Sequence, residues 1–187
     1  MKFSSSDIQL KNKETVTIEL CKTEDAKDLI TTVKAYLADS KYTLTGPEDF
    51  DPPLEQEEQW IRSFLENENS LLLIARQGGK ILGNIDITGG KREIIKHTAA
   101  IGMGLLKEWR NTGLGTALLN KGIEWAMKNP LLEILWLQVF ADNAAAIAIY
   151  KKAGFEVDGI QKRFFKAKDN LYYDNIIMSL DVRNKNN

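Results

Sequence analysis

A strand, a glycine-containing loop and a helix follow one another in IGMGLLKEWRNTGLGTALL, residues Ile101–Leu119, and this order constrains the fold more than any other stretch. The apolar run is typical of a strand, and the helix that opens after the loop ends before Pro130. Backbone N–H groups at the start of a helix point in one direction and coincide with the positive end of the helix dipole. We therefore expect a diphosphate to bind between strand and helix.

The loop contains Arg110 and two glycines, Gly113 and Gly115. Glycines let the backbone approach phosphates closely, and an arginine can add charge-assisted hydrogen bonds. A plain strand-to-helix turn, with glycines needed for its geometry alone, is the alternative. Leu118 stands where a Rossmann loop has its third glycine, and no Gly-Lys-Ser/Thr follows, so neither of those nucleotide-binding motifs fits.

Hydrophobic periodicity predicts further elements on both sides of this stretch. Two short apolar runs near the N-terminus predict a hairpin, or a strand with a polar lead-in. Strands are expected over residues 71–75, 81–88, 98–106, 133–140, 155–161 and 172–180, and helices over 23–37, 54–67, 113–128 and 143–153. The apolar side of the second helix is expected to consist of Trp60, Ile61, Phe64 and Leu65. This order predicts an α/β fold with a mixed, largely antiparallel central sheet and helices on both faces.

The composition fits one globular domain of 187 residues, 43% hydrophobic and 27% charged. We expect a polar N-terminal extension over residues 1–15 and one domain over residues 16–183. The 25 Lys and Arg nearly balance the 26 Asp and Glu, so overall charge does not indicate binding to nucleic acid or a membrane. Cys21 is the single cysteine, and no apolar run reaches the roughly 20 residues of a membrane span, which favours the cytoplasm.

The pattern Arg-x-x-Gly-x-Gly, placed between a strand and an amphipathic helix, resembles the signature of the GNAT family of N-acetyltransferases. A second block, LWLQVFADNAAAIAIYKKAGF at Leu135–Phe155, is similar to that family's second cofactor-binding block. There a strand is followed by an asparagine, an alanine-rich helix, a tyrosine and a Gly-Phe pair. The resemblance implies a GNAT-like acyl-CoA acyltransferase fold, acetyl-CoA as cosubstrate without a metal, and direct transfer of the acetyl group to an amine.

The resemblance places acetyl-CoA in a V-shaped cleft between two splayed strands, here those ending at Leu105 and Phe140. A bulge near the end of the first strand would free the backbone of Met103, Gly104 and Leu105 for the acetyl-pantetheine arm. The residues implied at the pyrophosphate are Arg110, Asn111, Thr112, Gly113, Leu114, Gly115 and Thr116. Asn143 matches an asparagine that contacts the cofactor, and its position equally suits a helix cap.

Tyr150 matches the family tyrosine whose hydroxyl faces the thioester sulfur, where a phenol can stabilise or protonate the leaving thiolate. The alternative for Tyr150 is packing of its ring. The attacking amine must also lose a proton, and Gln138 and Ala100 replace the glutamates that serve as base in many relatives. The base is therefore not identified by resemblance. Asp86 on the preceding strand and a water chain are candidates, and an amine of low pKa would need no base.

His97 and Cys21 each have a structural and a functional interpretation. His97, the single histidine, precedes the strand at 98–106, where a hydrogen-bonded strand end is favoured over a proton relay. Cys21 is expected to be a small core residue rather than a nucleophile, because direct transfer needs none.

The acceptor side is expected to form from residues 36–60 and 163–173. The first region contains six acidic residues, Glu48, Asp49, Asp51, Glu55, Glu57 and Glu58. An acidic rim would attract a cationic amine or polyamine, whereas a solvated helix face is the commoner reason for such a run. We expect the acceptor to be a primary amine of a small molecule. The alternatives are N-terminal acetylation of a peptide or ribosomal protein, and acyl-CoA binding without catalysis; the family also suggests a homodimer.

Overall fold

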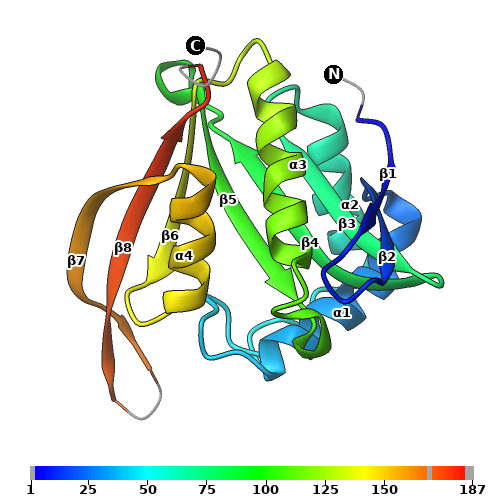
Figure 1. The fold of residues 1–187 in the computed structure, drawn as a ribbon, viewed down its shortest axis with the longest axis horizontal. Coiled ribbons are helices and arrows are strands. Elements are labelled where there is room, and N and C mark those ends of the chain that lie inside the picture. The colour runs from blue at the N-terminus through cyan, green and yellow to red at the C-terminus, as the bar shows by residue number, and fades with distance from the viewer. Residues whose placement is uncertain (1–2, 168–169, 184–187) are drawn as a thin grey trace.

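The apolar runs of the sequence form one eight-stranded sheet in the computed structural model, which describes residues 3–167 and 170–183 (Figure 1). The strands are β1 (Ser6–Gln9), β2 (Thr15–Leu20), β3 (Leu71–Gln77), β4 (Lys80–Gly89), β5 (Thr98–Leu105), β6 (Ile134–Phe140), β7 (Glu156–Lys166) and β8 (Tyr172–Asp181). Their order in the sheet is β1-β2-β3-β4-β5-β6-β8-β7. The β5–β6 pair is parallel and the other pairs are antiparallel, which confirms the mixed, largely antiparallel sheet.

Helices cover both faces of this sheet, as the alternation of elements predicts (Figure 1). The α-helices are α1 (Ala26–Ala38), α2 (Leu54–Glu66), α3 (Leu114–Lys128) and α4 (Ala144–Ala153), and the short 3-10 helices are η1 (Thr23–Asp25), η2 (Glu93–Ile95) and η3 (Lys107–Trp109). Helices α1 and α2 pack on one face, and α3 and α4 on the other. Within the described residues, no helix has the length and apolar character needed to cross a membrane.

The sheet separates two hydrophobic clusters. Along β3, Leu71 and Leu73 belong to the cluster under α3 and α4, whereas Leu72 and Ile74 belong to the cluster under α1 and α2. Successive side chains of a strand point to opposite faces, so a continuous apolar run is buried on both sides. Cys21 is fully buried in the second cluster, as expected for a small core residue.

Two predictions about local structure are refined by the fold. The N-terminal apolar runs form a hairpin, in which β1 pairs with β2 at the edge of the sheet. The inward face of α2 consists of Glu57, Ile61 and Phe64, whereas Leu65 is 50% exposed, so its assignment to the apolar side is wrong. Glu57, Ile61 and Phe64 follow the helical repeat of one face, and Leu65 lies about 100° further round the helix.

Candidate functional site

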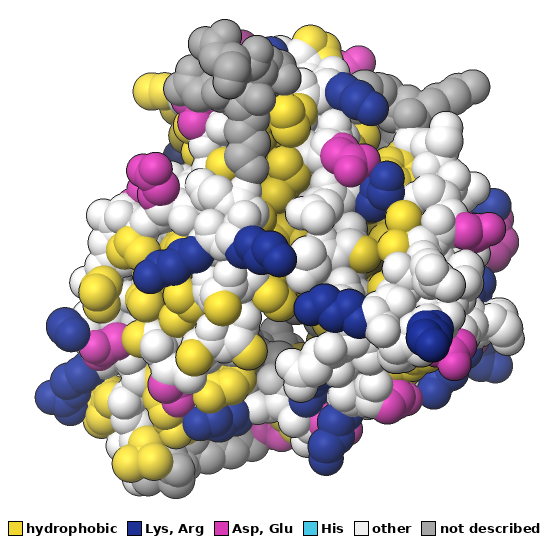
Figure 2. All heavy atoms as spheres, in the orientation of Figure 1, with side chains coloured by type: hydrophobic (Ala, Val, Ile, Leu, Met, Phe, Trp, Pro, Cys, Tyr) yellow, Lys and Arg dark blue, Asp and Glu magenta, His cyan; other side chains and the backbone are white. Residues whose placement is uncertain are grey.

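Strands β5 and β6 pair at one end and then diverge. Their paired residues are Thr98 with Ile134, Ala99 with Leu135 and Ala100 with Trp136. Beyond Ala100, β5 continues to Leu105 still paired with β4, and β6 continues to Phe140 still paired with β8. One backbone edge of β5 is therefore left without a sheet partner. The strands splay as expected, and Figure 2 shows this face of the molecule hollowed between α4 and the start of α3.

The predicted bulge near the end of β5 is wrong. The strand keeps one register with β4 along its whole length. The register shift of this region lies between β3 and β4, where Leu82 is left over. Divergence from β6, and not a bulge, leaves the backbone edge at Met103, Gly104 and Leu105 unpaired.

The loop between β5 and α3 has the backbone conformation of a tight helix entry. Gly113 is the N-cap of α3 with a φ of 95°, a left-handed conformation that glycine adopts without strain. Asn111 also has a positive φ, of 64°. The Thr112 hydroxyl donates to the Trp109 carbonyl at 2.7 Å and accepts the Leu114 N–H at 3.4 Å. The loop is thus held by its own contacts.

Lys11, from the turn between β1 and β2, lies against this loop. Its backbone N–H donates to the Thr112 carbonyl at 3.0 Å, and its side-chain carbons lie 3.4–3.7 Å from where a Cβ on Gly113 would stand. Within the described residues, no hydrogen bond uses the backbone amides of Gly115 and Thr116, which belong to the first turn of α3. Free amides and a lysine therefore flank one loop, and both favour an anion. Sequence reasoning missed Lys11 because no local pattern signals this contact.

The guanidinium of Arg110 bonds to the protein itself. Its Nε and Nη2 both donate to the Leu105 carbonyl at 3.3 Å, and its Nη1 donates to the Asp39 carbonyl at 3.3 Å. Arg110 therefore ties the end of β5 to the C-terminal end of α1. A guanidinium has five N–H groups, so two remain for another partner.

On the face of the sheet that α1 and α2 cover, two glycines of β5 make room for side chains. Asp86 of β4 pairs with Gly102, and a Cβ on Gly102 would stand 2.6 Å from its carboxylate Oδ1. The ring of Tyr36 from α1 occupies the place of a Cβ on Gly104. The Tyr36 hydroxyl donates to Oδ1 of Asn84 at 3.2 Å. Paired antiparallel residues share a face, so these side chains gather at one place beside the splay.

The surroundings of Asp86 and Tyr150 raise the pKa of both side chains. Burial raises the pKa of Asp86 from 3.8 to about 6, although hydrogen bonds from Thr88 and from the Gly102 backbone oppose the rise. Burial also raises the pKa of Tyr150 to about 12, and the charge of Asp86 adds to this rise. Tyr150 belongs to the cluster under α3 and α4, so the two groups interact from opposite faces of the sheet. Strongly shifted pKa values of this kind are frequent at functional sites.

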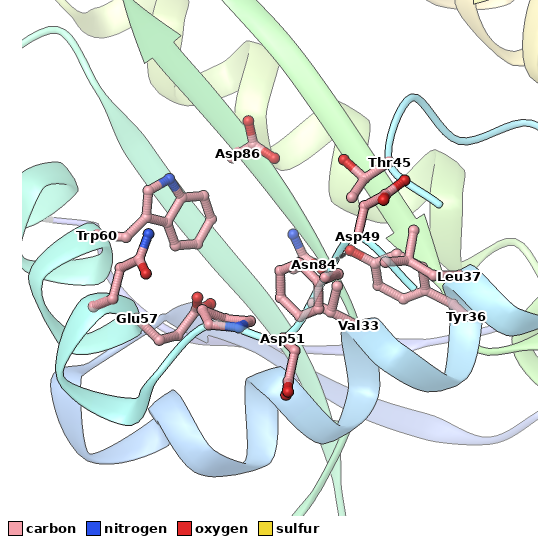
Figure 3. Close-up of a pocket in the computed structure, with 13 residues that line it drawn as sticks. Val33, Tyr36, Leu37, Thr45, Asp49, Asp51, Glu57, Trp60, Asn84 and Asp86 are labelled. Atoms are coloured by element: carbon pink, nitrogen blue, oxygen red, sulfur yellow. Dashed lines mark hydrogen bonds between the residues drawn. The ribbon is translucent and has the colours of Figure 1, made fainter. Parts of the chain in front are cut away.

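A pocket of about 500 Å³ opens beside Asp86, between α1, α2 and β4 (Figure 3). Residues 36–60 supply most of its lining, as expected for the acceptor side. Of the predicted acidic rim, Asp49, Asp51 and Glu57 line the pocket, and Glu48, Glu55 and Glu58 do not. Tyr36 and Trp60 add aromatic walls, and Asp86 borders the pocket from the sheet (Figure 3).

Three side-chain amides, on β6, β8 and β7, form a hydrogen-bond network across these neighbouring strands. The Asn175 Nδ2 donates to Oε1 of Gln138 at 3.0 Å and to Oε1 of Gln161 at 2.8 Å. An amide nitrogen has two hydrogens, so these bonds use both of them and turn both glutamine carbonyls toward Asn175. Asn175 is fully buried. Gln138 is therefore held by a partner on β8 that sequence reasoning missed, since the two residues are distant in the chain.

The loop after α1 closes over the end of β6. The Tyr42 hydroxyl donates to the Asp142 carbonyl at 3.2 Å, and the Tyr42 ring lies edge-on to Phe140 with 5.8 Å between centroids. Phe165 stacks on Phe140 at 4.1 Å, and Tyr173 meets the same ring at 5.8 Å. Tyr42, Phe165 and Tyr173 come from the two regions predicted for the acceptor side, and Phe140 comes from β6. Residues 168 and 169 of the second region lie outside the described residues.

Asn143, Ala100 and His97 take part in a helix cap, a strand pair and a strand end, respectively. The Asn143 side chain accepts the Ala146 N–H at 3.2 Å and so caps α4, which leaves its Nδ2 group available. Ala100 is the last residue of β5 that pairs with β6. His97 is exposed at the opposite end of β5 from the splay, and its carbonyl accepts the Glu133 N–H at 2.8 Å, as favoured for a strand end.

Comparison with known proteins finds a family whose sequence pattern matches this chain. The pattern described as "Acetyltransferase (GNAT) family" matches residues 34–155. An L-amino acid N-acetyltransferase of Escherichia coli (strain K12) is 30% identical over 112 residues, which cover 60% of this chain and 69% of that relative. The [ribosomal protein bS18]-alanine N-acetyltransferase of the same strain is 39% identical over 75 residues, 40% of this chain and 49% of that relative.

Solved structures share the whole fold. An acetyltransferase of the GNAT family from Streptococcus pneumoniae has a TM-score of 0.86 and 27% identity, covering 89% of this chain and 99% of that one. A phosphinothricin acetyltransferase from Sinorhizobium meliloti, solved in complex with AcCoA, has a TM-score of 0.78 and 15% identity, covering 89% and 88% of the two chains. The second likeness shows the fold alone.

Proposed function

The chain belongs to the GNAT acetyltransferase family and is an N-acetyltransferase, and from this premise we propose that it transfers the acetyl group of acetyl-CoA to a primary amine of a small molecule. One observation carries the proposal. The splay between β5 and β6 lies between a loop with unused backbone amides at the start of α3 and a carboxylate-lined pocket on the other face of the sheet. A negatively charged cosubstrate and a positively charged acceptor are thus favoured on opposite sides of one opening.

The residues around the splay fit an acyl-coenzyme A. The edge of β5 that faces away from β4 offers peptide groups near Met103 to the amides of the pantetheine arm, although the Leu105 carbonyl on it already accepts from Arg110. The amides of Gly113, Gly115 and Thr116, which make no hydrogen bond within the described residues, and the Lys11 side chain offer positive groups to the pyrophosphate. Arg110 and Asn143 keep donors that their internal bonds do not use. When bound, acetyl-CoA supplies an acetyl thioester that is activated toward attack by an amine.

We assign the role of proton acceptor to Asp86. An amine is mostly protonated at neutral pH, and its lone pair becomes available only when a proton leaves. A carboxyl group with a pKa of about 6 is ionised at pH 7, yet it binds a proton more readily than an exposed carboxylate does. Asp86 can therefore take a proton from the ammonium group before the nitrogen attacks, which frees the lone pair that forms the new bond to carbon. Asp86 thereby takes the role of the base, which neither Gln138 nor Ala100 can fill in place of the usual glutamates.

We assign the role of hydrogen-bond donor at the leaving sulfur to Tyr150. Its pKa of about 12 lies well above the roughly 8.5 of an ordinary thiol, so the proton stays on the phenol and the hydroxyl stabilises the thiolate as a donor. Within the described residues, no hydrogen bond occupies this hydroxyl. In the balanced reaction a C–N bond forms and the C–S bond breaks. The ammonium loses two protons, of which one ends on the thiol and the other leaves through Asp86 to water.

Thiol release from acetyl-CoA, measured with small amines, amino acids and peptides, tests this proposal. We expect turnover with small primary amines, and mass spectrometry should find one acetyl group added to the amine. Turnover confined to peptides would remove the small-molecule assignment. The pocket volume of about 500 Å³ is typical of a small-ligand site.

Acetylation of a protein N-terminus is the second candidate. It is favoured by the 39% identity over 75 residues with an enzyme named for ribosomal protein bS18. Gln138, which is held by Asn175 and cannot act as a base, counts against it. A short peptide beginning with alanine, included in the same assay, separates the two candidates.

A further inference from the structure

Glu57 is a largely buried residue of α2 whose carboxylate lines the pocket and has no hydrogen-bond or ion-pair partner among the described residues. It occupies an inward position of α2, on the same stripe as Ile61 and Phe64, and is 5% exposed. Within residues 3–167 and 170–183, neither a hydrogen bond nor an ion pair reaches its carboxylate, and burial raises its pKa. An apolar side chain would be more stable at such a position. The retained carboxylate therefore points to a ligand that supplies the missing partner.

The surroundings of Glu57 favour a cation. It lines the same pocket as Asp86, and neither lysine nor arginine is among the lining residues (Figure 3). Asp51 at this pocket is already paired with Lys34, whereas Glu57 and Asp86 have no such partner in the described part of the chain. Burial raises the pKa of Tyr36 most, and the charges of Asp86 and Glu57 raise it further, so the Tyr36 hydroxyl lies in the field of both carboxylates.

The walls suit an organic ammonium group. Trp60 and Tyr36 both line the pocket, and the face of an aromatic ring attracts a cation (Figure 3). Among the described residues, no group of three His, Cys, Asp or Glu side chains is arranged to hold a metal ion.

We propose that the acceptor carries two cationic groups, and that Glu57 binds the one that is not acetylated. This inference rests on the proposed acetylation of a small amine. The amine to be acetylated lies beside Asp86 and β5, and the second ammonium group lies against Glu57 on α2, beside the Trp60 ring. The substrate class is that of diamines and polyamines, in which an aliphatic chain joins the two charges.

The test compares diamines with monoamines of equal length. The wild-type protein should acetylate 1,4-diaminobutane and 1,5-diaminopentane with a kcat/KM at least about 10-fold above that for n-butylamine and n-pentylamine. Glu57→Gln keeps the size and hydrogen-bonding capacity of the side chain but removes its charge. It should raise KM for the diamines by about 10- to 100-fold and leave the monoamines within about twofold.

Glu58→Gln is the matched control, because it removes the same charge from the next residue of α2, which does not line the pocket. Its kinetics should equal those of the wild type. The melting temperature of Glu57→Gln without ligand should equal or exceed that of the wild type, since an unpaired buried charge is removed. A raised KM in a protein with an unchanged melting temperature then reports on binding and not on misfolding.

Three outcomes would overturn the inference while leaving the acetylation of small amines in place. They are an unchanged diamine KM in Glu57→Gln, equal kcat/KM for diamines and monoamines in the wild type, and an equal loss for both amine classes in the variant. If no small amine is acetylated but peptides are, the proposed function fails instead. Calorimetric titration of 1,4-diaminobutane into the protein with coenzyme A then reads the Glu57 site directly. If the wild type binds 1,4-diaminobutane and Glu57→Gln does not, the dication site is supported. If the wild type does not bind it, the inference is overturned.

Discussion

The carboxylate of Asp86 on β4 lies over Gly102 on β5, so closely that a Cβ at Gly102 would stand 2.6 Å from Oδ1. Because Gly102 has no side chain, the Asp86 carboxylate can occupy the space above it. Gly102 lies just beyond the last pairing of β5 with β6, where the strands begin to splay. The geometry of the proposed base thus depends on a residue that carries no functional group.

Gly102→Ala should lower kcat by about 10- to 100-fold, because the added methyl group displaces the Asp86 carboxylate and a small misplacement of a catalytic group is costly. The KM for acetyl-CoA should change little. Gly159→Ala is the control, since nothing lies within 4 Å of a Cβ at that position. A fully active Gly102→Ala protein would show that the position of Asp86 is not critical.

The rate should depend on the ionisation of Asp86. A base must be deprotonated, so kcat/KM should rise with pH through about 6 and level off above pH 7. Asp86→Asn should lack this rise and should be slower by about 10²- to 10⁴-fold at pH 7.5. The measurement is a pH–rate profile of both proteins between pH 5 and about 8, at acceptor concentrations well below KM so that the rate reports kcat/KM. An unchanged profile in the variant would assign the titrating group elsewhere.

Tyr150→Phe should reduce kcat by about 10- to 100-fold, because one hydrogen bond to the developing thiolate is lost. Coenzyme A affinity, measured by calorimetry, should stay within about twofold, since the ring still packs beside Phe155. With its pKa raised to about 12, Tyr150 should cause no fall in the wild-type rate up to about pH 10. Full activity of the variant would reassign Tyr150 to packing alone.

Lys11→Gln should weaken coenzyme A binding by about two- to fivefold at low salt, because it removes a positive charge beside the loop at Gly113. The difference from the wild type should shrink as ionic strength rises, since an exposed cation is screened. Lys13→Gln removes the same charge from the same turn without this contact, and its affinity should match the wild type. Equal affinities of both variants would exclude Lys11 from the anion site.

The elements of this fold could be predicted because their signals are local. The helix start at Leu114 follows from Gly113 before it, and the buried run at 71–75 indicates a central strand. The divergence of β5 and β6 could be expected through the family resemblance but not from the residues alone, because pairing that stops after Ala100 leaves no mark in either strand.

The contacts that sequence reasoning missed join residues far apart in the chain. Lys11 meets Gly113 through the hairpin, and Asn175 holds Gln138 across two strands. The burial of Glu57 is different, because a signal was present. Its spacing of four and seven residues from Ile61 and Phe64 places it on the inward stripe of α2, although the acidic run around it suggests a solvated face.

Arg110 gives the two halves of the site a common anchor. One side chain holds the Leu105 carbonyl at the end of β5 and the Asp39 carbonyl at the end of α1, the helix that carries Tyr36 into the pocket beside Asp86. Loss of the Arg110 side chain would therefore release a backbone carbonyl at the end of β5 and another at the end of α1 in a single substitution.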